Sequence, residues 1–156
     1  MESVLLLKQG AVKNVQMADY LLSTTYPLVK EPKTLILISN HVLSSFMSSV
    51  SALLAFERSQ RTIPSYHDTN ESKLNCFRQH IVGKYKLEEY ATVIERIMRL
   101  SEKHKQAAIS FSRDKKYVMC ADQFSTIESI SEADVKQYIR KAKEFITTVD
   151  RLVLHE

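Results

Sequence analysis

Apolar side chains recur at helical spacing along most of the chain. The longest such stretch spans residues 33–61 and contains no Gly or Pro. One apolar stripe consists of Leu35, Ile38, Val42, Phe46, Val50 and Leu53, and a second consists of Ile36, Leu43, Met47 and Leu54. Apolar positions three and four residues apart share a helix face, and two stripes mean that more than one face is buried. The pattern predicts a central bundle helix, about 40 Å long at ~1.5 Å per residue.

Four further helices are expected around this one. The first covers residues 2–26, and its stripe consists of Val4, Leu7, Ala11, Val15, Ala18 and Leu22. Pro27 and Pro32 are expected to break the chain after it, because proline lacks an amide hydrogen and restricts the preceding residue. The next two helices are predicted at about 71–83, ended by Gly83, and at about 87–107. The last runs to about residue 153.

Residues 109–130 differ in character from the helical stretches. Phe111 is followed by a polar turn at 112–116 and then by a β-favouring run at 117–119. A short hairpin or an irregular arm is expected here, and Ser131 with Asp134 resembles an N-cap pair for the last helix. The predicted fold is therefore all-α, an up-and-down bundle of about five helices with this insertion before the last helix. We expect one domain over residues 1–156.

Five serines of the central helix permit two interpretations. They are Ser44, Ser45, Ser48, Ser49 and Ser51. Small side chains let helix axes approach closely, in a core or in a dimer seam. The alternative is a polar groove that binds a ligand.

Composition limits the class of protein. The chain has only two Gly and three Pro, which favours long helices over sheets joined by tight turns. Two cysteines are too few for a disulfide framework, and no apolar run approaches the length of a membrane span. We expect a cytoplasmic protein with no membrane contact.

The net charge of +4 is unevenly distributed. Residues 58–116 hold thirteen basic and seven acidic side chains, so this segment carries +6. A basic segment could attract a polyanion such as RNA, and it could equally be an ordinary solvated surface. The candidate nucleic-acid contacts are Lys103, Lys105, Arg113, Lys115 and Lys116. Phe111 and Tyr117 lie among them and could stack on bases, or could simply be buried beneath a solvated turn.

Motifs for metal, cofactor and nucleotide binding were not found. None of the five histidines forms a His-x-x-x-His pair, and neither cysteine has a second cysteine nearby. Gly10 and Gly83 stand alone, which excludes a glycine-rich phosphate loop. We expect no metal and no cofactor.

One pair of residues could act together in catalysis, namely Arg99 and His104 with four residues between them. With the two long N-terminal helices and the basic later helices, this Arg-x4-His spacing resembles the HEPN-type helical bundles of prokaryotic toxin–antitoxin and defence systems. The similarity covers about residues 2–107, with the last helix as a further bundle member. The stretch from Ala18 to Pro27 and the stretch from His104 to Arg113 are also similar to those of a group of small archaeal proteins.

The resemblance implies two alternative functions. In active HEPN proteins an Arg and a His from two subunits cut RNA without metal, and the corresponding residues here are Arg99 and His104. Other members are inactive and bind a nucleotidyltransferase or another partner. Five residues along a helix rotate the side chain so that Arg99 and His104 would point about 140° apart. Apart from the resemblance, Arg99 can pair with Glu95, and His104 can be a helix-end residue.

Our leading hypothesis from the sequence is a non-enzymatic HEPN-like interaction module that forms a homodimer and binds a protein partner or RNA. The alternative is a metal-independent HEPN-type ribonuclease that uses Arg99 and His104. A helical ligand-binding or structural protein is a third option.

Overall fold

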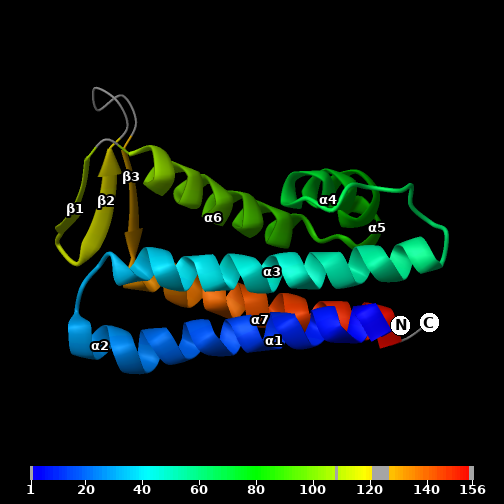
Figure 1. Ribbon diagram of the computed structural model, residues 1–156, viewed down its shortest axis with the longest axis horizontal. Helices are drawn as coiled ribbons and strands as arrows, with labels where there is room; N and C mark the ends of the chain where they lie inside the picture. Colours follow the sequence, from blue (N-terminus) through cyan, green and yellow to red (C-terminus); the bar gives the residue numbers. More distant parts are fainter. Residues whose placement is uncertain (1, 108, 121–126, 155–156) are drawn as a thin grey trace.

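The computed structural model describes residues 2–107, 109–120 and 127–154. Within these residues it contains five continuous helices and a three-stranded antiparallel sheet inserted before the last helix (Figure 1). Two of the helices include a wider π-helical turn, η1 or η2. In chain order the helices are α1 (Glu2–Tyr20) continued by η1 (Leu21–Thr25) and α2 (Tyr26–Val29), α3 (Thr34–Ser59), α4 (Asn70–Cys76) continued by η2 (Phe77–Val82) and α5 (Gly83–Tyr85), α6 (Glu88–Gln106), and α7 (Glu132–Leu154). The predicted fold class is confirmed.

The four long helices α1, α3, α6 and α7 lie lengthwise and alternate in direction (Figure 1). Helix α3 packs against each of the other three, so it is the central helix that its two apolar stripes predict. Its length and composition would suit a membrane span, and it is the one such helix among the described residues. However, 67% of its most apolar 18-residue window is buried inside the bundle, which accounts for its apolar character.

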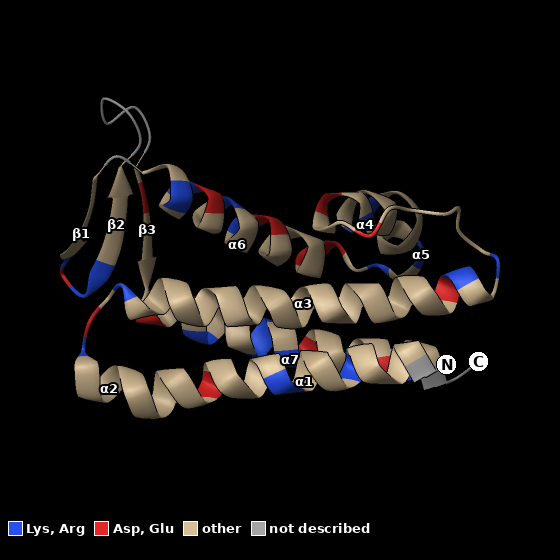
Figure 2. Ribbon diagram, in the orientation of Figure 1, with Lys and Arg blue, Asp and Glu red and all other residues tan. Residues whose placement is uncertain are grey.

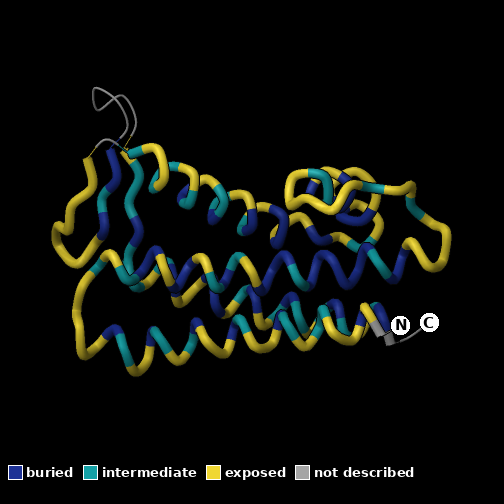
Figure 3. The backbone as a smooth tube through the Cα atoms, viewed as in Figure 1, coloured by how far each residue is buried: buried dark blue, intermediate teal, exposed yellow. Residues whose placement is uncertain are grey.

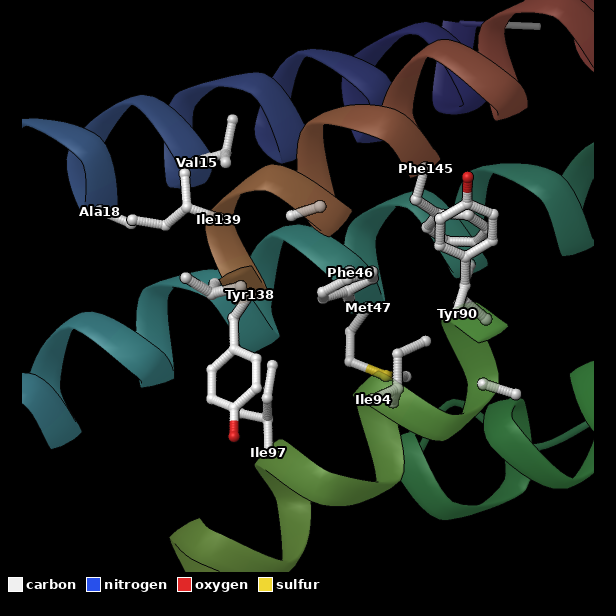
Figure 4. Close-up of a cluster of buried hydrophobic side chains, with 14 of the residues drawn as sticks. Val15, Ala18, Phe46, Met47, Tyr90, Ile94, Ile97, Tyr138, Ile139 and Phe145 are labelled. Carbon is white, nitrogen blue, oxygen red and sulfur yellow. The ribbon is translucent and has the colours of Figure 1, made fainter. Parts of the chain in front are cut away.

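The core forms where the apolar stripes of the helices meet. Phe145 of α7 lies at its centre, with ring centroids 5.7 Å from Phe46, 5.9 Å from Phe77 and 5.0 Å from Tyr90. Figure 4 shows Phe46, Tyr90 and Phe145 converging from three helices. Aromatic pairs at such distances add about 0.5–1.5 kcal/mol beyond the area that they bury. These contacts join α3, η2, α6 and α7 into a single core.

The predicted helix breaks at Pro27 and Gly83 are wrong, whereas the break expected at Pro32 is confirmed, because residues 30–33 lie outside the helices. The first helix continues through Pro27, because the backbone widens at η1 and the amide of Tyr26 donates to the carbonyl of Leu21, five residues earlier. This π-helical turn precedes the proline, whose missing amide hydrogen would otherwise interrupt the ladder. The helix ends at Lys30 in the left-handed conformation. Gly83 is likewise helical, and the chain turns at Lys86.

The insertion is a regular sheet with the order β1–β2–β3. Its strands are β1 (Ile109–Arg113), β2 (Lys116–Cys120) and β3 (Ile127–Ser131). Asp114 and Lys115 form the β1–β2 turn, both with positive φ, as a two-residue type I′ turn requires. The hairpin alternative is confirmed, and β3 is an additional strand. The backbone amides of Ser131 and Asp134 each bond the other's side chain, which confirms the N-cap pair of α7.

The serines of α3 are divided between the two interpretations. Ser45 is buried, and its hydroxyl donates to the carbonyl of Ala11 at 2.7 Å, so a small side chain permits close approach of α1 and α3. Ser44, Ser48 and Ser51 line a shallow groove of about 300 Å³ beside Asn70 and Lys73. Close helix packing is therefore established at Ser45, while part of the stripe borders a surface groove.

Candidate functional site

A cleft of about 450 Å³ opens at the end of the bundle that carries the sheet. The start of α3, the loop before it and the last turn of α6 contribute its walls. Its lining residues are Glu31, Lys33, Thr34, Ile36, Leu37, Asn40 and His104. The cleft is thus mixed in character, with one histidine, charges of both signs and two aliphatic side chains.

His104 is the titratable side chain that α6 presents to this cleft. Its ring lies against that of Tyr117 on β2, with centroids 5.7 Å apart. Its Nδ1 atom is enclosed, and among the described residues it has no hydrogen-bond partner. Buried polar atoms normally have such a partner, so this ring nitrogen is an exception among the described residues. An imidazole there could hold or transfer one proton.

Arg99 does not join His104 in this cleft. Helix α6 is unbroken between the two residues, so their side chains leave it about 140° apart. The Nε of Arg99 lies 3.7 Å from Glu128 of β3, whose carboxylate is at the same distance from Arg96. The expected Glu95–Arg99 pair is wrong, because Glu95 is 2.6 Å from Arg78 instead. Within one chain, the geometry does not assemble the Arg-x4-His pair.

The candidate nucleic-acid residues fall into two groups. Lys103 and Lys105 belong to the end of α6, where β1 begins, whereas Arg113, Lys115 and Lys116 lie at the opposite end of that strand (Figure 2). All three residues at the turn are exposed. Tyr117 is buried beneath His104, while Phe111 on β1 remains 39% exposed. Of the two interleaved aromatic rings, only that of Phe111 is open to a stacking partner.

A buried carboxylate escaped the sequence analysis. Glu57 near the end of α3 is 1% exposed, accepts hydrogen bonds from Thr62 and Tyr85, and lies 3.3 Å from the ammonium of Lys84. Burial alone would raise the pKa of Glu57, but the bonds from Thr62 and Tyr85 and the charge of Lys84 outweigh it and lower the pKa. Since Lys84 and Tyr85 belong to α5, we interpret Glu57 as a structural tie between α3 and α5.

The sequence contained a signal for this tie. Glu57 lies seven residues after Val50 and four after Leu53, so a charged residue occupies a position of the buried stripe. A charge at such a position requires partners, because an unpaired buried carboxylate is strongly unfavourable.

A second feature that was missed is the outer face of α1, which we define as Leu5, Leu6, Val12, Met17 and Tyr20. All five side chains are exposed, Leu6 by 67% and Tyr20 by 58%. They lie opposite the stripe that packs on α3 and α7, which includes Val15 and Ala18 (Figure 4). Figure 3 shows this exposed side along the edge of the bundle.

Charged residues occur along α1 as well (Figure 2), and Lys13 on the outer side is exposed. Two of the charged residues of α1 are held by α7, since Lys8 lies 3.0 Å from Asp150 and Asp19 lies 2.8 Å from Lys143. A shallow groove of about 420 Å³ follows the same side, and its lining residues are Leu5, Lys8, Gln9, Val12, Lys13, Gln16 and Asp150. The exposed apolar side chains of this face are therefore interspersed with exposed polar ones, namely Gln9, Lys13 and Gln16.

The remaining chemistry-bearing residues are dispersed. In the described part of the chain, no three His, Cys, Asp or Glu side chains gather as metal ligands would. Cys76 and Cys120 are both buried with free thiols, and burial raises the pKa of the Cys76 thiol. The chain matches no known family model, no curated protein and no solved structure.

Proposed function

We propose that this protein is a non-enzymatic interaction module that forms a homodimer and binds a protein partner through the outer face of α1. One observation supports the choice above all: large apolar side chains remain exposed along a helix whose opposite side already packs into the core. Contiguous exposed apolar patches on proteins are usually interaction sites, because leaving them in water is unfavourable.

The chemistry of this face suits a protein better than RNA. A nucleic-acid surface presents Lys and Arg to phosphates. The outer face of α1 instead presents two leucines, a valine, a methionine and a tyrosine, with Lys13 as its exposed cation in the adjoining groove. Aromatic and methionine side chains are enriched at protein interfaces, and Tyr20 and Met17 supply both. The HEPN resemblance, which implies partner binding by inactive members, is consistent with this use and suggests a nucleotidyltransferase as one partner to test.

The experiment compares capture by the natural chain and by an α1 variant. Tagged protein is used to isolate partners from extracts of its own cells, and each captured protein is then produced pure and titrated against the chain. The Leu6→Glu/Met17→Glu variant should lose at least tenfold in affinity for the partner, because it places two charges on the face. The control is Asn75→Glu/Gln79→Glu, which adds the same charge at exposed positions of α4 and η2. Equal affinity for all three proteins would contradict the proposal.

A second candidate, the metal-independent ribonuclease, is supported by the position of His104 at the wall of the cleft of about 450 Å³. Since Arg99 is held by Glu128 on another side of α6, a second copy would have to supply the arginine. Labelled RNA incubated in EDTA tests this candidate directly. Cleavage that disappears in His104→Ala, with helical circular dichroism unchanged, would support the ribonuclease. Intact RNA, or cleavage that survives the substitution, would contradict it.

A further inference from the structure

The strand β1 forms one edge of the sheet. In the order β1–β2–β3, β3 packs against α3, α6 and α7, whereas among the described strands β1 pairs with β2 alone. All five residues of β1 are exposed. It holds no Pro, and its first four residues carry no charge. Edge strands of this kind present unpaired backbone groups on which another strand can add.

The hairpin geometry defines which groups face outward. In a two-residue β-turn the flanking residues, here Arg113 and Lys116, exchange both of their backbone hydrogen bonds. Hydrogen-bonded pairs then alternate along an antiparallel ladder, so the next is Phe111 with Val118. The amides and carbonyls of Ser110 and Ser112 consequently point away from β2. They offer two donors and two acceptors to an additional strand.

We propose that this edge pairs with the β1 strand of a second copy of the chain, antiparallel and with the two-fold axis at Phe111. The stretch Ser110–Phe111–Ser112 is symmetric about its centre. Ser110 of each copy therefore faces Ser112 of the other copy. Both serines have the outward backbone groups that the pairing needs. Phe111 then faces its own counterpart at a non-hydrogen-bonded position, where Cα atoms approach to about 4.5 Å and side chains interact most closely.

Charge and side-chain placement are compatible with this register. Arg113 faces Ile109 of the other copy, and the two Arg113 residues are offset by four positions, about 14 Å along the strands. Phe111 lies on the more exposed side of the sheet with Ile109, Val118 and Ile127, none of which is buried, although Cys120 on the same side is buried. Two clefts at this end of the described chain are lined by other segments and not by β1, so a peptide added to β1 would not place its side chains in them. These features favour a second copy over a foreign peptide.

This inference rests on the homodimer of the proposed function and specifies its surface. Phe111→Cys and Arg113→Cys variants are oxidised mildly and run on non-reducing gels. A disulfide needs Cα atoms about 4.4–6.8 Å apart. Phe111→Cys should therefore form a cross-linked pair of about 36 kDa, twice the 18.0 kDa chain. Arg113→Cys is the matched control and should remain monomeric on the gel, since its two sulfurs lie too far apart.

A second pair of variants tests the backbone contact. Ser112→Pro removes an outward amide hydrogen while leaving the β1–β2 ladder, and Ser112→Thr keeps that hydrogen. Light scattering should show the natural chain and Ser112→Thr near 36 kDa and Ser112→Pro near 18 kDa, with the helical circular dichroism of all three alike.

Three results would overturn the inference: equal cross-linking at positions 111 and 113, a dimer that survives Ser112→Pro, or a dimer abolished by Leu6→Glu/Met17→Glu alone. A natural chain that is monomeric would contradict both the inference and the homodimer. Partner capture through the outer face of α1 is measured separately, so its failure is distinguishable from failure of the β1 contact.

Discussion

Helices α1 and α3 lie side by side and are both rich in apolar residues, yet they use them differently. Most of the apolar side chains of α3 are buried, whereas α1 buries one stripe and exposes another (Figure 3). The apolar residues of α3 stabilise the fold, since each apolar side chain removed from water contributes about 1.5–3 kcal/mol to the free energy of folding. The exposed side chains on the outer face of α1 gain little of this free energy in the isolated chain, because they remain largely in water. The difference separates residues that hold the fold from residues that remain for a partner.

The largest expected effect belongs to the buried side of this comparison. Phe145→Ala should lower the free energy of unfolding by about 3–5 kcal/mol, because it removes a fully buried ring in contact with three other aromatic rings. Urea denaturation followed by circular dichroism measures this loss. A change below 1 kcal/mol would mean that the aromatic cluster is not the centre of the core.

A smaller effect is expected at the buried tie near the end of α3. Tyr85→Phe removes one hydrogen bond to the Glu57 carboxylate and should lower the free energy of unfolding by about 1.5–3 kcal/mol at neutral pH.

The pKa of Glu57 is lowered in the fold, so the stability that Glu57 contributes is fully present above the ordinary glutamate pKa and is lost as pH falls below it. The difference between the natural chain and Glu57→Gln should therefore shrink below about pH 4. Thermal melts between pH 3 and pH 7, about one unit apart, test this trend; a difference that grows on acidification would contradict it.

Gly10 offers a change in the opposite direction on α1. A Cβ at this position would lie 3.6 Å from the hydroxyl of Ser48, which is an ordinary contact. Gly10→Ala should therefore stabilise the protein by about 1 kcal/mol, because alanine is the better helix former. Urea denaturation checks this value, and destabilisation would show that α1 and α3 approach more closely than the structure indicates.

The smallest effect on stability is expected at the outer face of α1. Leu6→Glu/Met17→Glu should change the free energy of unfolding of the purified protein by less than about 0.5 kcal/mol per site, since exposed positions make few contacts. The measurement is the same urea titration. A loss comparable to that of Phe145→Ala would show that this face supports the fold, and the comparison between the two helices would fail.

The sequence predicted the helices well because their apolar spacing is long and regular. It failed where backbone geometry decides: Pro27 is accommodated by a π-helical turn, and Gly83 continues a helix that Lys86 ends. β3 was missed, since Ile130 is its one fully buried apolar residue and the pattern is short.

The candidate site was harder to predict than the fold. The spacing identified His104, but the partners of Arg99 depend on where β3 lies, which periodicity does not reveal. The outer face of α1 was visible in the sequence as apolar residues outside the main stripe. Only the packing of α3 and α7 on the opposite side shows that they remain exposed.

The central claim is that a partner covers the outer face of α1, and oxidative footprinting of methionines tests it most directly. Met17 on this face is 46% exposed, whereas Met47 on α3 is 6% exposed. In the purified chain, Met17 should oxidise much faster than Met47. In the complex isolated from cells, the account predicts that Met17 slows toward the rate of Met47. A Met17 that oxidises equally fast in the complex and in the free chain would contradict the claim.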